Sequence, residues 1–470
     1  MTAERARGAS SLARVEAILA NPELYALAEA IPDTDPTAGG RPRDFPPVLA
    51  VLFETLISVY GSARQVEAEI SHPAVWRMIR EGLQANGGIR VGAKPMRRHH
   101  YLHYRNTYMS DPDVLARLDQ IHRDFAAAQA LEVGVLDPDS EGSWTHPNRA
   151  RLIYGDGKVI TPLFKARPGD TKLDKTTGEL RPVRAENDAD LHFEGTGEFA
   201  WGTKWVIMAA RGTQLRHRII LDVLPVPDKG GEAAVAVESV ERLVPLLPGA
   251  QGVVYDTALR GVHHQRIMRD LGLLSINRVA LAKAGSKKPR RRKAEQRQEK
   301  STLIETKTIT LPDGTERVVP LYARGGAPGI GRMLDDGSME FEPLRRIRTH
   351  RRADKVGTFR FYNDYELPDD LGGAVITIRL HGNDEDAARK LNRTENLRPI
   401  PPGDPDFERI FPLRADAESI NRGLEDTLYL RRAHSVGRAR QHVNLIGWAL
   451  MVNSLTRAEH RARPPDALAA

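Results

Sequence analysis

Apolar residues recur at helical spacing through the first 135 residues of the chain. Their period predicts helices over residues 9–30, 46–59, 63–70 and 111–131, and one more that begins at His72-Pro73. The Gly61-Ser62 break between two short helices permits a helix-turn-helix unit, a motif that recognises DNA. An ordinary helical subdomain fits the same pattern. For residues 1–135 the sequence therefore predicts a helical domain and leaves DNA binding by it open.

From residue 150 the periodicity changes to short apolar runs typical of strands. Strands are predicted over residues 152–154, 159–164, 204–210, 218–226, 251–255 and 273–279, and helices over residues 231–247 and 262–271. The first two runs predict a hairpin that turns at Asp156-Gly157. Strands that alternate with helices are typical of a layered α/β core, which we assign first to residues 150–282.

The second half of the chain changes pattern twice more. Alternating residues over 301–380, with a turn at Pro312-Asp313-Gly314, predict a β-rich insertion that we place at residues 301–400. Helices predicted over 415–429 and 438–458 complete the core within residues 405–460, and residues 461–470 are expected to form a disordered tail. A chain of 470 residues is too long for one ordinary core, which agrees with several domains.

Positive charge is concentrated in one segment. Residues 281–300 contain nine Lys or Arg and two Glu, a net charge of +7 that equals the formal net charge of the whole chain. A focused basic segment suits a nucleic-acid backbone better than a diffuse positive surface would. We expect residues 283–300 to be a basic linker, solvated when free and able to order on DNA. Its candidate DNA contacts are Lys287, Lys288, Arg290, Arg291, Arg292 and Lys293.

The composition excludes several classes of site. The chain has no cysteine, which excludes disulfides, cysteine-ligated zinc, iron–sulfur clusters and thiol catalysis. No apolar stretch approaches the roughly 20 residues that span a bilayer. These features predict a cytoplasmic protein that does not bind membranes.

Three carboxylates occupy positions from which one fold can bring them together. Asp156 and Asp256 each follow a short apolar run, and Glu418 lies in an arginine-rich predicted helix. Singly, each has an ordinary explanation: a hairpin turn, a helix cap and a solvated helix residue. Together, in a basic protein, they predict a site for two Mg²⁺ ions acting on a phosphodiester, because Mg²⁺ prefers carboxylate and water ligands.

Two arginines accompany the third carboxylate. Arg414 lies four residues before Glu418 and Arg422 four residues after it, so the three share one helical face. This spacing fits a ladder of intrahelical salt bridges. It also fits arginines that hold DNA phosphates beside a metal-binding glutamate.

The residues around Glu418 resemble a known pattern. A group of DDE transposases from bacterial insertion sequences carries Tyr, Arg, Glu and Lys at fixed spacing, with a β-rich insertion before the glutamate. Laid on this chain, the pattern falls on Phe411, Arg414, Glu418 and Glu425, so Arg and Glu match while Phe replaces Tyr and Glu replaces Lys. The segments 417–422, 433–437 and 200–204 also look like transposase-related sequences of the actinobacterial type. The resemblance covers roughly residues 150–460.

The resemblance implies an α/β fold with an RNase H-like core, an inserted β-rich domain and an N-terminal helical domain. It implies that Asp156, Asp256 and Glu418 are both catalytic residues and metal ligands for two Mg²⁺ ions, with Mn²⁺ as an expected substitute. Such enzymes cleave double-stranded DNA at transposon ends and join the freed 3′-hydroxyl to target DNA. They act as homodimers or larger synaptic complexes, here in the bacterial cytoplasm at the nucleoid.

Two other functions stay open at the level of sequence. The departures at Phe411 and Glu425 fit a catalytically impaired, transposase-derived protein that only binds DNA. A metal-dependent, structure-specific nuclease on the same core would cleave strands without joining them.

Overall fold

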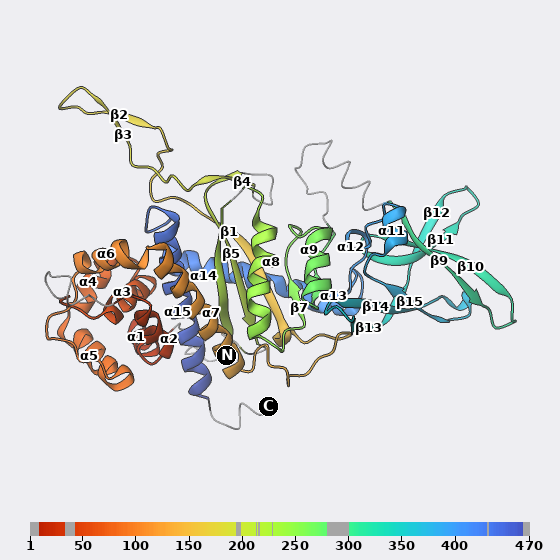
Figure 1. Ribbon diagram of the computed structural model, residues 1–470, viewed down its shortest axis with the longest axis horizontal. Helices are drawn as coiled ribbons and strands as arrows, with labels where there is room; N and C mark the ends of the chain where they lie inside the picture. Colours follow the sequence, from red (N-terminus) through yellow and green to blue (C-terminus); the bar gives the residue numbers. More distant parts are fainter. Residues whose placement is uncertain are drawn as a thin grey trace.

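The computed structural model of the chain describes residues 9–32, 43–193, 199–212, 214, 217–227, 229–279, 300–429 and 432–463. The helical N-terminal region lies at one end of the molecule, a mixed sheet lies in the middle, and the β-rich region lies at the other end (Figure 1). The fold is thus mixed α/β, as the sequence predicts. Within the described residues, no helix has the length and apolarity that crossing a membrane requires.

The central sheet has six strands. They are β1 (Leu152–Ile160), β4 (Asp190–Phe193), β5 (Phe199–Arg211), β6 (Arg218–Val226), β7 (Gly252–Val254) and β8 (Leu274–Ile276). The order is β4-β5-β1-β7-β8, and β6 also pairs with β5. Strands β1, β7 and β8 are parallel, whereas β5 runs antiparallel to β1 and to β6. The carboxyl ends of three parallel strands therefore meet at one edge of the sheet.

The predicted hairpin at Asp156-Gly157 is wrong, because β1 is a single strand. It pairs with β5 without interruption from Ile153 opposite Ala210 to Ile160 opposite Thr203. A glycine on each side of Asp156 suggested a turn, yet neither Gly155 nor Gly157 has a positive φ. The long partner strand β5 holds this segment extended, so Asp156 lies within a strand.

Helices cover the two faces of the sheet. The N-terminal helices are α1 (Ser11–Leu19), α2 (Pro22–Glu29), α3 (Pro47–Tyr60), α4 (Ala63–Ile70), α5 (Pro73–Gly87), α6 (Arg98–Tyr104) and α7 (Pro112–Glu132). The helix predicted over residues 9–30 is two helices, because Asn21 caps α2 immediately before Pro22. The other predicted helices of this region match α3, α4, α5 and α7 closely.

The last helix, α15 (Arg438–Arg461), lies inside the core that the N-terminal helices form. Its Leu445 and Trp448 are buried in one apolar cluster with Phe53 of α3 and with Trp205 and Ile220 of the sheet. The other face of the sheet packs on α8 (Glu232–Leu243) and on the end of α7. The N-terminal helices are thus bound to the sheet through α15 and through α7. DNA binding by these helices stays a prediction.

The β-rich region contains two antiparallel sheets. The first consists of β9 (Thr302–Thr310), β10 (Glu316–Arg324), β11 (Ala327–Met333) and β12 (Met339–Pro343). The second consists of β13 (Arg345–Ala353), β14 (Phe359–Glu366) and β15 (Val375–Arg379). A third apolar cluster joins both to the β7–β8 edge of the central sheet. Helices α13 (Pro405–Ile410) and α14 (Ala415–Leu424) then return the chain to that sheet.

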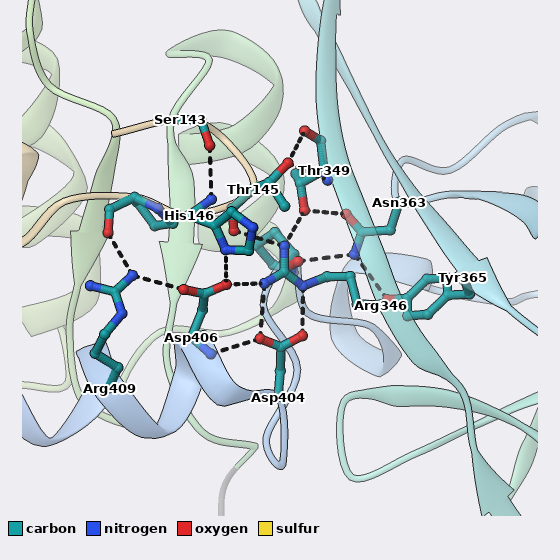
Figure 2. A network of polar contacts seen from close by, with 12 residues as sticks. Ser143, Thr145, His146, Arg346, Thr349, Asn363, Tyr365, Asp404, Asp406 and Arg409 are labelled. Carbon is teal, nitrogen blue, oxygen red and sulfur yellow. Dashed lines mark hydrogen bonds and ion pairs between the residues drawn. The ribbon is translucent and has the colours of Figure 1, made fainter. Parts of the chain in front are cut away.

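A buried arginine fastens the second of these sheets to the core. Arg346 of β13 binds the carboxylates of Asp404 and Asp406, which begin α13, and the Thr145 carbonyl oxygen in the loop that precedes β1 (Figure 2). The side chains of Arg346, Asp404 and Asp406 are at most 9% exposed. This network sets where α13, and hence α14, returns to the sheet.

Candidate metal centre

The register of the parallel strands brings Asp156 and Asp256 together. Tyr154 of β1 lies opposite Val254 of β7, and each aspartate follows two residues later. Beyond this pair β7 ends while β1 continues beside β5 alone, so the edge of the sheet opens next to both carboxylates. The strand ends thus position these two predicted residues side by side.

A third carboxylate joins them from a helix. Glu232 is the first residue of α8, and ligand oxygens of Asp156, Glu232 and Asp256 lie within 4.8 Å of one another. Three carboxylates at this separation fit a hard divalent cation such as Mg²⁺, which takes oxygen ligands. Sequence reasoning missed Glu232, since an acidic residue in the first turn of a helix is ordinary.

Neighbouring donors fix the orientation of these carboxylates. Lys204 Nζ lies 2.5 Å from Glu232 Oε2, and the Tyr255 hydroxyl donates a hydrogen bond of 3.1 Å to Glu232 Oε1. The Asn421 amide of α14 donates to Asp156 Oδ2 at 2.8 Å, and the Ala258 backbone N–H donates to Asp256 Oδ1 at 2.7 Å. Such partners hold ligand oxygens in place.

Gly157 gives Glu232 its space. A Cβ added at Gly157 would overlap the Glu232 carboxylate, so any larger residue there forces that side chain to move. The missing side chain at Gly157 therefore lets α8 approach β1 closely. This use of glycine does not require a positive φ.

All three carboxylates predicted from the sequence line one cavity, but only two belong to the cluster. The cavity has a volume of about 430 Å³ and is lined by Asp156, Gly157, Phe193, Lys204, Glu232, Asp256, Thr257, Arg278, Phe411, Arg414 and Glu418. Glu418 is 55% exposed and forms an ion pair with Arg414, one turn before it on the same helix. The third carboxylate of the cluster is Glu232, so the prediction that Glu418 completes it with Asp156 and Asp256 is not borne out by this grouping.

The predicted DNA contacts have different surroundings. Arg414 lines the cavity, whereas Arg422 is 84% exposed, lies 3.7 Å from Asp426 and does not line the cavity. The ion pair between Arg414 and Glu418 thus lies at the cavity, whereas the ion pair between Arg422 and Asp426 lies outside it. The remaining predicted contacts, Lys287, Lys288, Arg290, Arg291, Arg292 and Lys293, lie outside the described residues.

The two departures from the resembled pattern have specific neighbours. The Phe411 ring stacks on the Phe407 ring with centroids 4.9 Å apart, and the Arg278 guanidinium carbon lies 5.0 Å from the Phe411 ring centroid. Glu425 forms an ion pair with Lys158 of β1, two residues after Asp156. A positive charge is therefore present near position 425, supplied by the strand.

Burial, together with repulsion between the carboxylates, changes the acidity of the site. Burial is the main cause that raises the pKa of Asp156 to about 7, and repulsion from Asp256 adds to it, against the opposing effect of Arg414. Burial also raises the pKa of Asp256, and the Glu232 charge adds to it. A cluster of this kind favours a cation, because a bound cation offsets the repulsion.

We expect Asp156→Asn to stabilise the metal-free protein at pH 8 by about 1–3 kcal/mol, because a carboxyl with a pKa of about 7 when folded and about 3.9 when unfolded disfavours the fold once it ionises. The loss of wild-type folding stability grows as pH rises from about 4 to about 7 and does not change further above pH 7. The stability advantage of Asp156→Asn over the wild type should therefore vanish below about pH 4. Urea unfolding of both proteins in EDTA, at several pH values, measures it.

Comparison with known proteins gives no assignment, since no protein-family model and no curated protein matches the chain. The function has to be inferred from the geometry of the site.

Proposed function

We propose that this chain is a Mg²⁺-dependent DNA transposase of an insertion sequence, which cleaves DNA at transposon ends and joins the ends to target DNA. One observation carries the proposal: a cavity at the carboxyl ends of parallel strands contains four carboxylates, Asp156, Glu232, Asp256 and Glu418, together with three basic side chains. Carboxylates suit metal ions and the basic side chains suit phosphates, so the cavity is suited to a phosphodiester.

The strand order supports an RNase H-like core. The strands β6, β5, β1, β7 and β8 lie in that spatial order, the first three antiparallel and the last three parallel. Helix α8 connects β6 to β7, and α9 (Gly261–Gln265) lies between β7 and β8. The β-rich segment then precedes the helix with Glu418, as the resemblance implies.

The metal ligands we propose are Asp156, Glu232 and Asp256, with Glu418 at the rim of the same cavity. Two bound divalent ions would activate the attacking oxygen and stabilise charge on the leaving oxygen. The chain's own residues orient this centre: Lys204 and Tyr255 hold Glu232, and Asn421 holds Asp156. Arg414 places a guanidinium where a substrate phosphate enters.

The proposed partners are double-stranded DNA and further copies of the chain in a synaptic complex. The resemblance implies both, and the basic segment 281–300 of the sequence favours DNA. We propose the bacterial cytoplasm at the nucleoid as its location, because that is where its DNA substrate would lie.

The test uses a labelled duplex that ends in the inverted repeats flanking the gene, with and without Mg²⁺. Wild-type protein should nick it and join the 3′ end to a target plasmid. Asp156→Ala, Asp256→Ala and Glu418→Ala should each abolish joining while leaving DNA binding largely intact. Retained joining in one variant would remove that residue from the proposed catalytic set, and binding without any nicking by the wild type would favour a DNA-binding protein.

A structure-specific nuclease is the second candidate, and one observation favours it. The cluster of Asp156, Glu232 and Asp256 is complete without Glu418, so hydrolysis needs no ligand from α14. Cleavage that persists in Glu418→Ala, with no joined product from the wild type, would support this function over transposition.

A further inference from the structure

Arg278 lines the cavity of the carboxylate cluster and lies two residues beyond the end of β8, the strand that pairs with β7. Val254 of β7 pairs with Ile276 of β8, and Asp256 and Arg278 each follow two residues later. The buried Asn277 fixes this part of the backbone, since its amide donates to the Asp256 carbonyl oxygen at 3.2 Å and accepts from Arg398 Nε at 2.8 Å. The strand end thus places Arg278 beside the carboxylate cluster, in the wall of the same cavity.

An aromatic stack supports the side chain of Arg278. Its guanidinium carbon lies 5.0 Å from the Phe411 ring centroid, and Phe411 in turn stacks on the buried Phe407 at 4.9 Å, with ring planes 10° apart. A guanidinium on a ring uses its face for the cation–π contact. This contact leaves the N–H groups available for hydrogen bonds.

Arg278 differs from the other basic residues of the cavity. Lys204 is paired with Glu232, and Arg414 is paired with Glu418. Within the described part of the chain, no carboxylate lies within ion-pair distance of Arg278, although four carboxylates line the same cavity. A cation that is exposed, supported on a ring and unpaired beside a metal centre is suited to an anion that arrives with the substrate.

We propose that Arg278 binds a backbone phosphate of the DNA strand held at the metal centre, and that Phe411 is the positioning residue that holds the guanidinium ready. The inference rests on the proposed function for the identity of the substrate. It explains what a phenylalanine does at position 411, because the stack needs the ring and not a hydroxyl. It also adds a second phosphate contact to the one proposed for Arg414 in the same cavity.

The experiment measures binding of a labelled duplex in Ca²⁺, which occupies oxygen sites without supporting rapid cleavage, across a range of salt concentrations. Arg278→Ala should weaken binding about tenfold near 0.15 M salt. It should lower the slope of log affinity against log salt by about 0.9, the value for one phosphate contact. Arg278→Lys should keep part of the affinity that Arg278→Ala loses. Added guanidinium ion should raise the affinity of Arg278→Ala but not that of the wild type.

Arg324 supplies the matched control, because its guanidinium also lies over a phenylalanine, Phe341, at 5.9 Å but outside the cavity. Arg324→Ala should leave affinity and slope unchanged. Phe411→Leu alone should weaken DNA binding, but adding it to Arg278→Ala should cause no further loss of affinity. Phe411→Tyr should bind DNA nearly as well as the wild type. Additive losses in the double variant would show that Phe411 acts independently of Arg278 and would overturn its positioning role. Thermal unfolding of each variant checks the fold.

The outcomes separate this inference from the proposed function. An unchanged affinity and salt slope in Arg278→Ala, with a wild type that nicks DNA, overturns the inference and leaves the function standing. Binding that depends on Arg278 in a protein that never nicks DNA overturns the function and supports the inference. In an active wild type, Arg278→Ala should raise KM for DNA more than it lowers kcat, since the contact holds substrate in the ground state as well.

Discussion

Glu232→Gln should reduce Mg²⁺-dependent DNA cleavage by about a thousandfold or more, because it removes one of the three clustered carboxylates and weakens the metal centre directly. The amide keeps the size of the side chain, so the fold should be retained. Single-turnover nicking at saturating DNA measures the chemical step, and calorimetric titration of Mg²⁺ without DNA measures the loss of metal affinity.

Glu238 is the matched control for this prediction. It lies on the same helix, its side chain is 50% exposed, and it pairs with Arg242 instead of facing the cavity. Glu238→Gln should cleave DNA at the wild-type rate. If Glu232→Gln also cleaves normally, Glu232 is only the partner of Lys204, and the metal centre must be built from other carboxylates.

Glu418→Gln should behave differently from Glu232→Gln in the absence of DNA. Glu418 lies outside the cluster and is held by Arg414, so its loss should leave the affinity for the first Mg²⁺ ion nearly unchanged. Strand joining should still be lost if Glu418 enters the site with the substrate, as the proposed function requires.

The sequence was sufficient to find Asp156 and Asp256, and the structure explains why. Both follow apolar runs, and their separation of 100 residues equals the register offset between Tyr154 and Val254. An apolar run followed by an aspartate is visible without knowing the fold. The register itself is a property of the sheet, and it cannot be derived from either run alone.

The sequence-based predictions were wrong or incomplete where contacts between distant segments decide the local structure. The segment 155–157 has the composition of a turn, but pairing with β5 some fifty residues later keeps it extended. Glu232 was missed because its role depends on how α8 crosses the sheet and on the space left by Gly157. Glu418 was found through its spacing to Arg414, and that same arginine draws its side chain away from the cluster.

Arg346→Met should lower the free energy of unfolding by about 3–5 kcal/mol, the largest stability loss we expect from one substitution. All five N–H groups of Arg346 are bonded: to Asp404 at 2.7 and 2.8 Å, to Asp406 at 2.8 Å, and to the Thr145 carbonyl and Thr349 hydroxyl at 2.9 Å each (Figure 2). Removing the cation leaves two buried carboxylates with fewer partners, which costs far more than the ion pair itself contributes.

The neighbouring residue Arg345 provides the control. Its side chain is 72% exposed and pairs with Glu366, so Arg345→Met should cost at most about 1 kcal/mol. Adding Asp404→Asn to Arg346→Met should recover part of the stability, since it removes one of the unpaired charges. Urea unfolding measures all three variants, and equal losses for Arg345→Met and Arg346→Met would contradict the prediction. Because this network positions α13 and hence Arg414 and Glu418, Arg346→Met should also lower joining activity at temperatures where the variant stays folded.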